Sequence, residues 1–206
     1  MRGALLAICA LTALVLAAAA HAGGGRATNV VVYQPFTSAG ELKASIRVDD
    51  TLSGSCFVGS LASPRRDAWR CTVANDVYDP CFSPPVQPDA PTTAISFVVC
   101  PEFGLPPRRV DRIVLDEALP ADGNTGEPGA TRGRPFVLSA RPYAGYCSVV
   151  TGAAGTVQGR RVSYDCGRGG TLVGRIDRSR PRWTAKLLTQ GDNPTLYTVR
   201  IAIAWF

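Results

Sequence analysis

Apolar and polar residues alternate along several segments of this chain, most clearly at its C-terminus. From Tyr197 to Trp205 every second residue is apolar, and Thr198 and Arg200 between them are polar. A period of two is typical of a β-strand with one buried face. The same alternation predicts strands at residues 42–48, 69–73, 162–166 and 183–187, and short apolar runs predict more buried strands at 30–33, 95–99 and 113–115.

Turn-forming residues interrupt these segments too often for long helices. The chain has 206 residues, of which 21 are glycine and 16 are proline. Hydrophobic residues make up 46% of the chain, which is enough for a packed core. The sequence therefore predicts an all-β protein, either a β-sandwich or barrel-like, with one domain or two small β subdomains.

Residues 120–135 depart from the alternating pattern. They are rich in glycine, proline and polar residues and have no apolar face. This composition is typical of a linker or a long surface loop. We therefore expect an N-terminal β region at 23–119 with four cysteines and a C-terminal β region at 136–206 with two.

The first 22 residues are typical of a signal peptide. Arg2 provides the positive charge, the stretch from Leu5 to Ala20 is uncharged, and Ala22 ends a small-x-small cleavage motif. The apolar stretch is shorter than the roughly 20 residues that span a bilayer. An uncleaved membrane anchor is the alternative. We expect export to the extracellular space or the cell envelope, with no transmembrane segment after cleavage.

Cleavage would leave an even set of six cysteines. They are Cys56, Cys71, Cys81, Cys100, Cys147 and Cys166, because Cys9 would leave with the signal peptide. Such a set in an exported chain indicates a disulfide framework. Many pairings are open to six cysteines. We favour the sequential one (Cys56–Cys71, Cys81–Cys100, Cys147–Cys166), because each pair brackets turn signals between two strand-like segments.

The only histidine, His21, would also be removed with the signal peptide. Serine and cysteine nucleophiles usually depend on a histidine base. Lys43 and Lys186 lie on the polar faces of predicted strands, where they face solvent. The closely spaced cysteines or histidines of a structural zinc site are missing as well. We therefore expect no catalytic residue of this kind, no metal and no cofactor.

Paired carboxylates offer a different catalytic chemistry, because glycosidases use two acids that face each other. The candidate pairs are Asp49 with Asp50, Asp76 with Asp79, and Asp116 with Glu117. Such pairs also arise by chance in a chain with 16 acidic residues. A carboxylate-dependent extracellular hydrolase is therefore an alternative function.

Arginine supplies most of the net charge of +6. An arginine excess also arises from mutational bias in a high-GC genome, so a solvated surface explains much of it. Basic clusters occur at 65–66, 108–109 and 160–161, and the best candidate binding surface is formed by Arg175, Arg178, Arg180, Arg182 and Trp183. Positive charge beside an aromatic ring can bind an anionic polymer.

A second candidate surface is the segment from Pro80 to Pro85. Its three prolines and Cys81 indicate a stiff, disulfide-anchored loop. Secreted protease inhibitors present a binding segment in this way, because a preorganised loop loses little entropy on binding. A protease inhibitor is therefore another alternative function. The competing interpretation is a rigid connection between strands that has only a structural role.

Two stretches of the chain resemble known proteins. One holds Cys56, Trp69 and Cys71, and the other holds Cys166 and Trp183. Both are similar to a group of uncharacterised secreted, disulfide-bonded proteins of high-GC, actinobacterial-type bacteria. The resemblance implies an extracytoplasmic disulfide fold and carries over no catalytic residue.

The leading hypothesis is a secreted or envelope-associated protein with a binding or structural role. It follows from the missing histidine, the basic segments and the disulfide framework. The expected partner is an envelope polymer or another extracellular protein, and nucleic acid is not favoured. The sequence leaves the oligomeric state open.

Overall fold

The computed structural model describes residues 26–85, 94–120, 123–126, 133–142 and 144–206. Secondary structure in this part of the chain is β, apart from a 3-10 turn at Gly167–Gly169. Its strands are β1 (Asn29–Val31), β2 (Arg47–Gly59), β3 (Ala68–Val73), β4 (Asp76–Phe82), β5 (Ile95–Pro101), β6 (Arg109–Leu119), β7 (Val137–Arg141), β8 (Gly145–Val149), β9 (Thr156–Val157), β10 (Arg160–Asp165), β11 (Thr171–Asp177), β12 (Thr184–Leu188) and β13 (Leu196–Trp205). The predicted signal peptide lies outside the described residues.

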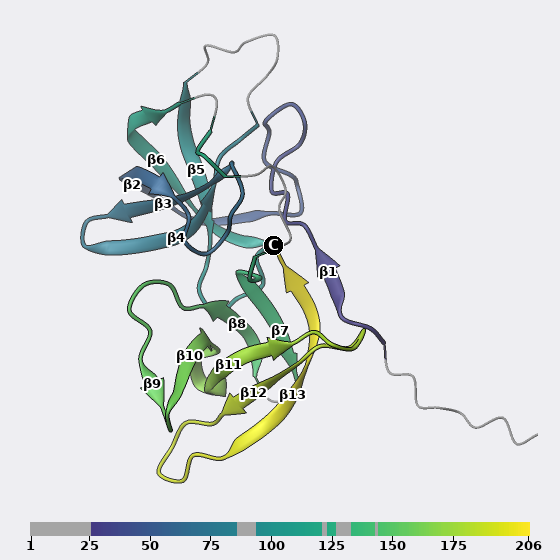
Figure 1. Cartoon of the computed structure of the whole chain (residues 1–206). Coiled ribbons are helices and arrows are strands. Elements are labelled where there is room, and N and C mark those ends of the chain that lie inside the picture. The colour runs from purple at the N-terminus through teal and green to yellow at the C-terminus, as the bar shows by residue number, and fades with distance from the viewer. Residues whose placement is uncertain (1–25, 86–93, 121–122, 127–132, 143) are drawn as a thin grey trace, which may run out of the picture.

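The strands form two closed barrels, one above the other in Figure 1. In the N-terminal barrel β2 to β6 pair in chain order, and β6 closes the ring by pairing in parallel with β2. The C-terminal barrel is formed by β7, β8, β10, β11, β12 and β13, and antiparallel pairing of β13 with β7 closes it. Closure leaves no strand edge of the ring unpaired. The predicted all-β, disulfide-linked fold is confirmed, in its barrel form.

Most strands expected from the alternation are present. The segments at 69–73, 95–99, 113–115, 162–166 and 183–187 fall largely within β3, β5, β6, β10 and β12. The expectation for 42–48 is wrong before residue 47, where β2 begins. Ile46 N donates to Lys43 O at 2.9 Å, which closes a turn at Ala44 and Ser45. Lys43 therefore lies in a turn region rather than in the middle of a strand.

A β-bulge changes which side of β13 faces the core. Ile201 pairs with Ala140 of β7, but the next pair joins Ile203 to Ser139, so one residue of β13 is unmatched. An extra residue exchanges the two faces of a strand. Ile201 is buried, whereas beyond the bulge Ala204 is buried and Trp205 is half-buried. The expectation that Trp205 shares the buried face of Ile201 is therefore wrong.

The three sequential disulfides are formed. Cys56–Cys71 joins β2 to β3, Cys81–Cys100 joins β4 to β5, and Cys147–Cys166 joins β8 to the end of β10. Disulfides persist in oxidising compartments rather than in the cytosol. The framework therefore fits a protein that folds outside the cytosol.

Strand β1 belongs to the C-terminal barrel although it precedes the N-terminal one. It pairs in parallel with the end of β13, with Val31 opposite Trp205. The Thr28 hydroxyl donates to Ile201 O at 2.7 Å and accepts from Trp183 N at 2.9 Å. The residues that lead into the first barrel are thus fixed to the second.

One buried apolar cluster extends through both barrels. It includes Phe82 and Val99 of the N-terminal barrel and Phe136 beside β7. The Tyr33 ring lies edge-on to Phe82 and Phe136, with ring centroids 5.0 and 5.5 Å away. Burial raises the pKa of the Tyr33 phenol far above its usual value. The barrels therefore share a core rather than touching through a polar surface.

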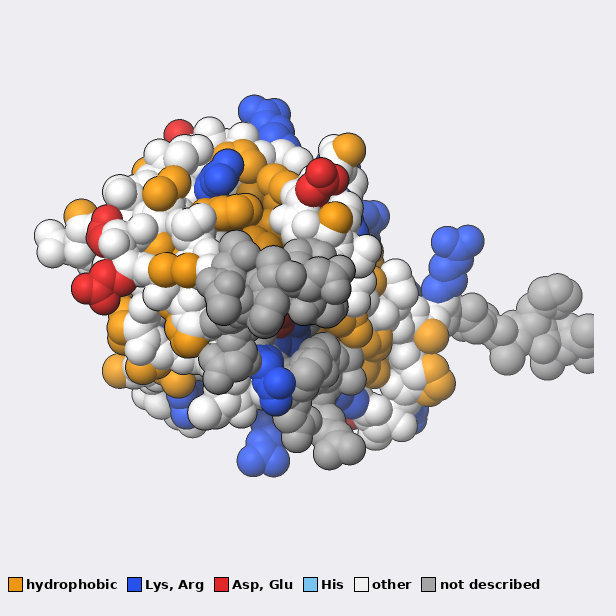
Figure 2. Space-filling model, turned by 90° about the horizontal axis from the view of Figure 1, so that it is seen from above, with side chains coloured by type: hydrophobic (Ala, Val, Ile, Leu, Met, Phe, Trp, Pro, Cys, Tyr) orange, Lys and Arg blue, Asp and Glu red, His pale blue; other side chains and the backbone are white. Residues whose placement is uncertain are grey.

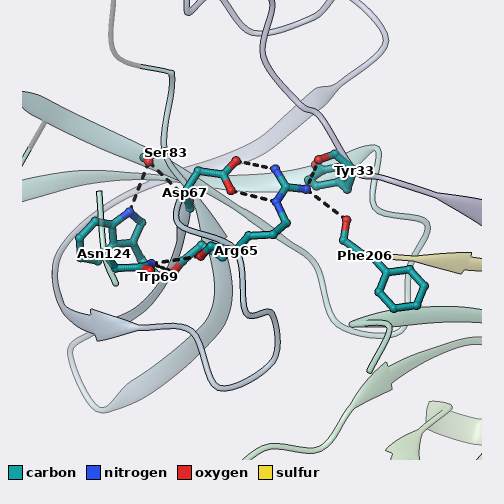
Figure 3. A network of polar contacts seen from close by, with 8 residues as sticks. Tyr33, Arg65, Asp67, Trp69, Ser83, Asn124 and Phe206 are labelled. Atoms are coloured by element: carbon teal, nitrogen blue, oxygen red, sulfur yellow. Dashed lines mark hydrogen bonds and ion pairs between the residues drawn. The ribbon is translucent and has the colours of Figure 1, made fainter. Parts of the chain in front are cut away.

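Arg65 connects the two barrels at this junction (Figure 3). Its side chain is 4% exposed, forms an ion pair with Asp67 and lies 4.7 Å from the centre of the Phe82 ring. Its guanidinium donates to Tyr33 O and to Phe206 O, the latter at 3.1 Å. One buried cation of the N-terminal barrel thus binds backbone carbonyls at both ends of the described chain.

Residues 123–126 of the predicted connection at 120–135 lie against the N-terminal barrel. Asn124 donates from its side-chain amide to Ala68 O and to Arg65 O, and its carbonyl oxygen accepts from Gly126 N at 2.6 Å. A side chain on Gly126 would collide with Pro64 O. This part of the connection is therefore held in place by specific contacts.

Candidate functional site: a basic groove with an aromatic floor

An open groove of about 490 Å³ lies between the two barrels. It is lined by Tyr146 of β8 and Trp205 of β13, here called its aromatic floor, and by residues of the segments 31–34, 43–46 and 106–108, here called its walls. The size is in the usual range for a small-molecule site. Five parts of the chain, from residue 31 to residue 205, therefore meet at one concave surface.

The aromatic floor results from strand geometry. Tyr146 lies outside the barrel because its neighbour Cys147 is fully buried, and Trp205 lies outside because of the bulge in β13. The two rings are 5.9 Å apart between centroids and inclined at 45°. Both are half-buried, so each keeps part of its surface open to the groove. The floor can therefore cover an apolar surface of a ligand.

The charge of the groove is positive and uncompensated. Lys43 and Arg108 line it together with no carboxylate. In the described part of the chain neither side chain has an ion pair, whereas the neighbouring Arg47 and Arg109 both bind Asp49, at 2.8 and 2.6 Å. The Arg109 guanidinium holds the pKa of the Asp49 carboxyl below its usual value. Arg109, the first residue of β6, thus lies beside acids, and Arg108 just before the strand lines the groove.

A second cavity, of about 310 Å³, has the opposite charge. It also lies between the barrels and is lined by Asp79, Glu102 and Asp111, near Ser148 and Val149 of β8. Burial raises the pKa of each of these three carboxyls. Asp79 is fixed by backbone N–H groups of Leu61 and Ala62, at 3.2 and 3.3 Å. Asp79 therefore stabilises the β2–β3 connection, and Glu102 lies 3.5 Å from the Arg109 guanidinium, which leaves Asp111 as the lining acid with no ion pair to another described residue.

The arginine surface predicted from the sequence is brought together only in part. Arg178 stacks on Trp183, 4.6 Å from the ring centre, and donates to Gly133 O. Arg182 donates to Arg26 O at 3.2 Å. Arg175 and Arg180 are exposed, and no contact joins them to the ring. Arg178 covers the tryptophan itself, so the ring offers less surface than the sequence suggested.

The predicted acid pairs do not face each other across a cleft. Asp49 is paired with arginines, and Asp116 accepts hydrogen bonds from Ser53 and Ser55 on an exposed surface. Asp79 lines the second cavity without its predicted partner Asp76. Strand pairing brings together acids distant in the chain, so Asp79 lines this cavity with Glu102 and Asp111 rather than with the acid nearest in sequence.

The expected loop at Pro80 to Pro85 is wrong. Asp79 to Phe82 belong to β4, and Pro80 to Ser83 are buried. Phe82 packs in the core between the barrels. A protease cannot reach a buried strand, so the described residues give the inhibitor hypothesis no support.

Basic side chains are also spread over the outer surface. On the face shown in Figure 2 they stand singly or in small groups among apolar and uncharged side chains. The groove differs from that face because its two cations lie beside aromatic rings in a concavity. Concave placement matters because a low-dielectric wall strengthens the field of a charge.

Comparisons with known proteins found no matching family model, curated protein or solved structure. Among the described residues, no three metal-binding side chains are grouped so that they could hold an ion. The described part of the chain also has no helix long and apolar enough to cross a membrane. The groove must therefore be interpreted from its own chemistry.

Proposed function

We propose that this protein is exported and binds an anionic polymer of its surroundings in the groove between the barrels. The observation that carries the proposal is that Lys43 and Arg108, without a neutralising acid, line the same groove as the rings of Tyr146 and Trp205. The positive charge attracts an extended anion, and the aromatic rings stabilise the complex when an apolar surface of the ligand packs against them. The resemblance to secreted actinobacterial-type proteins and the disulfides support an extracellular or envelope location.

Export can be tested by the mass of the protein recovered outside the cytosol. We expect a chain that begins at Gly23, after the Ala20-His21-Ala22 motif, because signal peptidase cuts after the second small residue. Its mass should be lower than that of the reduced chain by two hydrogens for each of the three disulfides. A chain that retains residue 1, or one that reacts with a thiol reagent before reduction, would contradict the proposal.

Binding can be tested with the double variant Lys43→Gln/Arg108→Gln. We expect its affinity for polygalacturonate and for inorganic polyphosphate to fall at least about tenfold, because one hydrogen bond to a charged group contributes about 1.5–3 kcal/mol. Calorimetric titration should also show weaker binding of the unchanged protein as salt rises from about 0.1 M to about 1 M.

The matched control is Arg175→Gln/Lys186→Gln, which removes the same charge from the exposed surface of the C-terminal barrel. We expect it to keep nearly full affinity. If this control lost binding and the groove variant kept it, the arginine surface would be the site and the groove would not. Failure of the unchanged protein to bind either polymer would reject the proposal.

A carboxylate-dependent hydrolase remains the second candidate. The observation in its favour is the cavity with Glu102 and Asp111, because a raised pKa allows a carboxyl to keep its proton and act as an acid. The mixtures of protein and polygalacturonate from the binding test can be assayed for hydrolysis. Release of new reducing ends from polygalacturonate, abolished by Asp111→Asn, would favour this function over simple binding.

A further inference from the structure

We infer that the polymer held in the groove is an acidic polysaccharide, with sugar rings stacked on Trp205 and Tyr146 and carboxylates bound by Lys43 and Arg108. This inference rests on the proposed function and makes its ligand specific. It uses three features of the groove that a purely electrostatic site does not need. These are the aromatic floor, the uncharged polar groups in the wall and the small number of cations.

The floor suits a flat, partly apolar ring. Tyr146 and Trp205 lie 5.9 Å apart between ring centroids and inclined at 45°, so they are in contact as a tilted pair and both line the groove. The C–H face of a sugar ring is apolar, and it loses contact with water when it covers an aromatic face. A polyphosphate chain has no such face and would leave both rings uncovered.

The wall offers uncharged hydrogen-bonding groups. The Gln34 amide and the Ser45 hydroxyl line the groove, and neither side chain makes a hydrogen bond to another described residue. An amide and a hydroxyl each donate and accept, as sugar hydroxyls do. Such groups distinguish a polyol from a polymer that has only anionic oxygens.

The charge of the groove is low for a phosphate polymer. Only Lys43 and Arg108 among the described lining residues are cationic. Proteins that follow nucleic-acid or phosphate chains neutralise many successive phosphates with lysine and arginine. An acidic polysaccharide spreads its carboxylates between uncharged ring surfaces, so two cations beside two rings match its pattern.

The test compares four probes of matched length: oligogalacturonate, a neutral glucan oligomer, inorganic polyphosphate and oligothymidylate. A Trp183→Phe background leaves Trp69 and Trp205 as the tryptophans. Trp69 is 5% exposed and its indole N–H donates to Ser83, so a change of fluorescence on titration reports on Trp205. We expect oligogalacturonate to change the emission and to bind about tenfold more tightly than each of the other three probes.

The variant Trp205→Leu should weaken oligogalacturonate binding about tenfold, and the matched variant Trp183→Leu should leave it unchanged. Both tryptophans are half-buried, so the pair controls for a general loss of aromatic packing. If Trp205→Leu does not fold, the emission change of the Trp183→Phe protein decides alone.

The outcomes separate this inference from the proposed function. The inference of a polysaccharide ligand would be wrong if polyphosphate or oligothymidylate bound as tightly as oligogalacturonate, or if the Trp205 emission did not change. A general polyanion site that depends on Lys43 and Arg108 would then remain. Binding of the neutral glucan as tightly as oligogalacturonate would overturn the acidic ligand. Binding of no probe would contradict both proposals.

Discussion

Replacing Arg65 by alanine should destabilise the protein by about 3–5 kcal/mol, because two hydrogen bonds from its guanidinium to backbone carbonyls are lost and a hydrogen bond to a charged group contributes about 1.5–3 kcal/mol. The guanidinium is 4% exposed and holds Asp67, Tyr33 O and Phe206 O together. Its loss leaves Tyr33 O without this donor, whereas Phe206 O still accepts from Tyr33 N at 2.8 Å, and a buried acceptor without a donor costs free energy. The measurement is the free energy of unfolding from urea denaturation with the disulfides intact.

The neighbouring variant Arg66→Ala is the control for Arg65. Arg66 is exposed, and its side chain donates to a single group of the described residues, Gly126 O, at 3.3 Å. Its removal should change the stability by no more than about 0.5 kcal/mol. Arg65→Lys keeps the charge without the forked geometry, so it should fall between the other two. Equal stability of the Arg65 and Arg66 variants would mean that the barrels are joined by apolar packing alone.

The double variant Cys147→Ala/Cys166→Ala should lose about 3 kcal/mol of stability. The bridge joins residues 19 positions apart in the chain, and both sulfur-bearing residues are buried. In the chain-entropy account, the cross-link stabilises the fold because it restricts the unfolded chain. Urea denaturation of the exported protein measures the effect, with the intact mass showing that the other two bridges are present.

The control for the disulfide variant is Cys9→Ala in the precursor. If residues 1–22 are removed on export, this change should alter neither the mass nor the stability of the exported protein. A disulfide variant as stable as the unchanged protein would indicate that the bridge does not restrict the unfolded chain. A destabilised Cys9 variant would indicate that the segment before residue 23 is retained and contributes to the fold.

The groove depends on how the two barrels are joined. Its floor belongs to the C-terminal barrel, one wall precedes β6 of the N-terminal barrel, and another comes from the segment that β1 fixes to β13. The groove therefore exists only while the barrels stay joined. We expect loss of the Arg65 contacts to disturb the groove as well as the stability, although Arg65 does not line it.

The strand pattern was largely predictable because half-buried strands require alternating residues. Residues 183–187 are an example, since Ala185 and Leu187 are buried in β12 as their spacing predicts. Strand β4 was missed because a segment with several prolines is typical of a loop, whereas its last three residues are buried between the barrels. Tertiary burial outweighed the local preference there.

The groove could not be predicted from the sequence, and the reason is physical. Arg108 was part of a visible basic cluster, and Trp205 was part of a visible strand, but a bulge decides which face of that strand the ring occupies. A single unmatched residue moves Trp205 from the expected core to the groove. No periodicity in the chain identifies the position of such a bulge.

The sequence by itself determined the all-β class and favoured the sequential pairing of the six cysteines, since alternation and short spacing are local properties. Only the tertiary structure decided that the strands close into two barrels, that β1 joins the distant β13, and that Lys43 and Arg108 meet two aromatic rings. These features depend on contacts between residues far apart in the chain. Such contacts are fixed by packing and strand register, which the order of residues does not display.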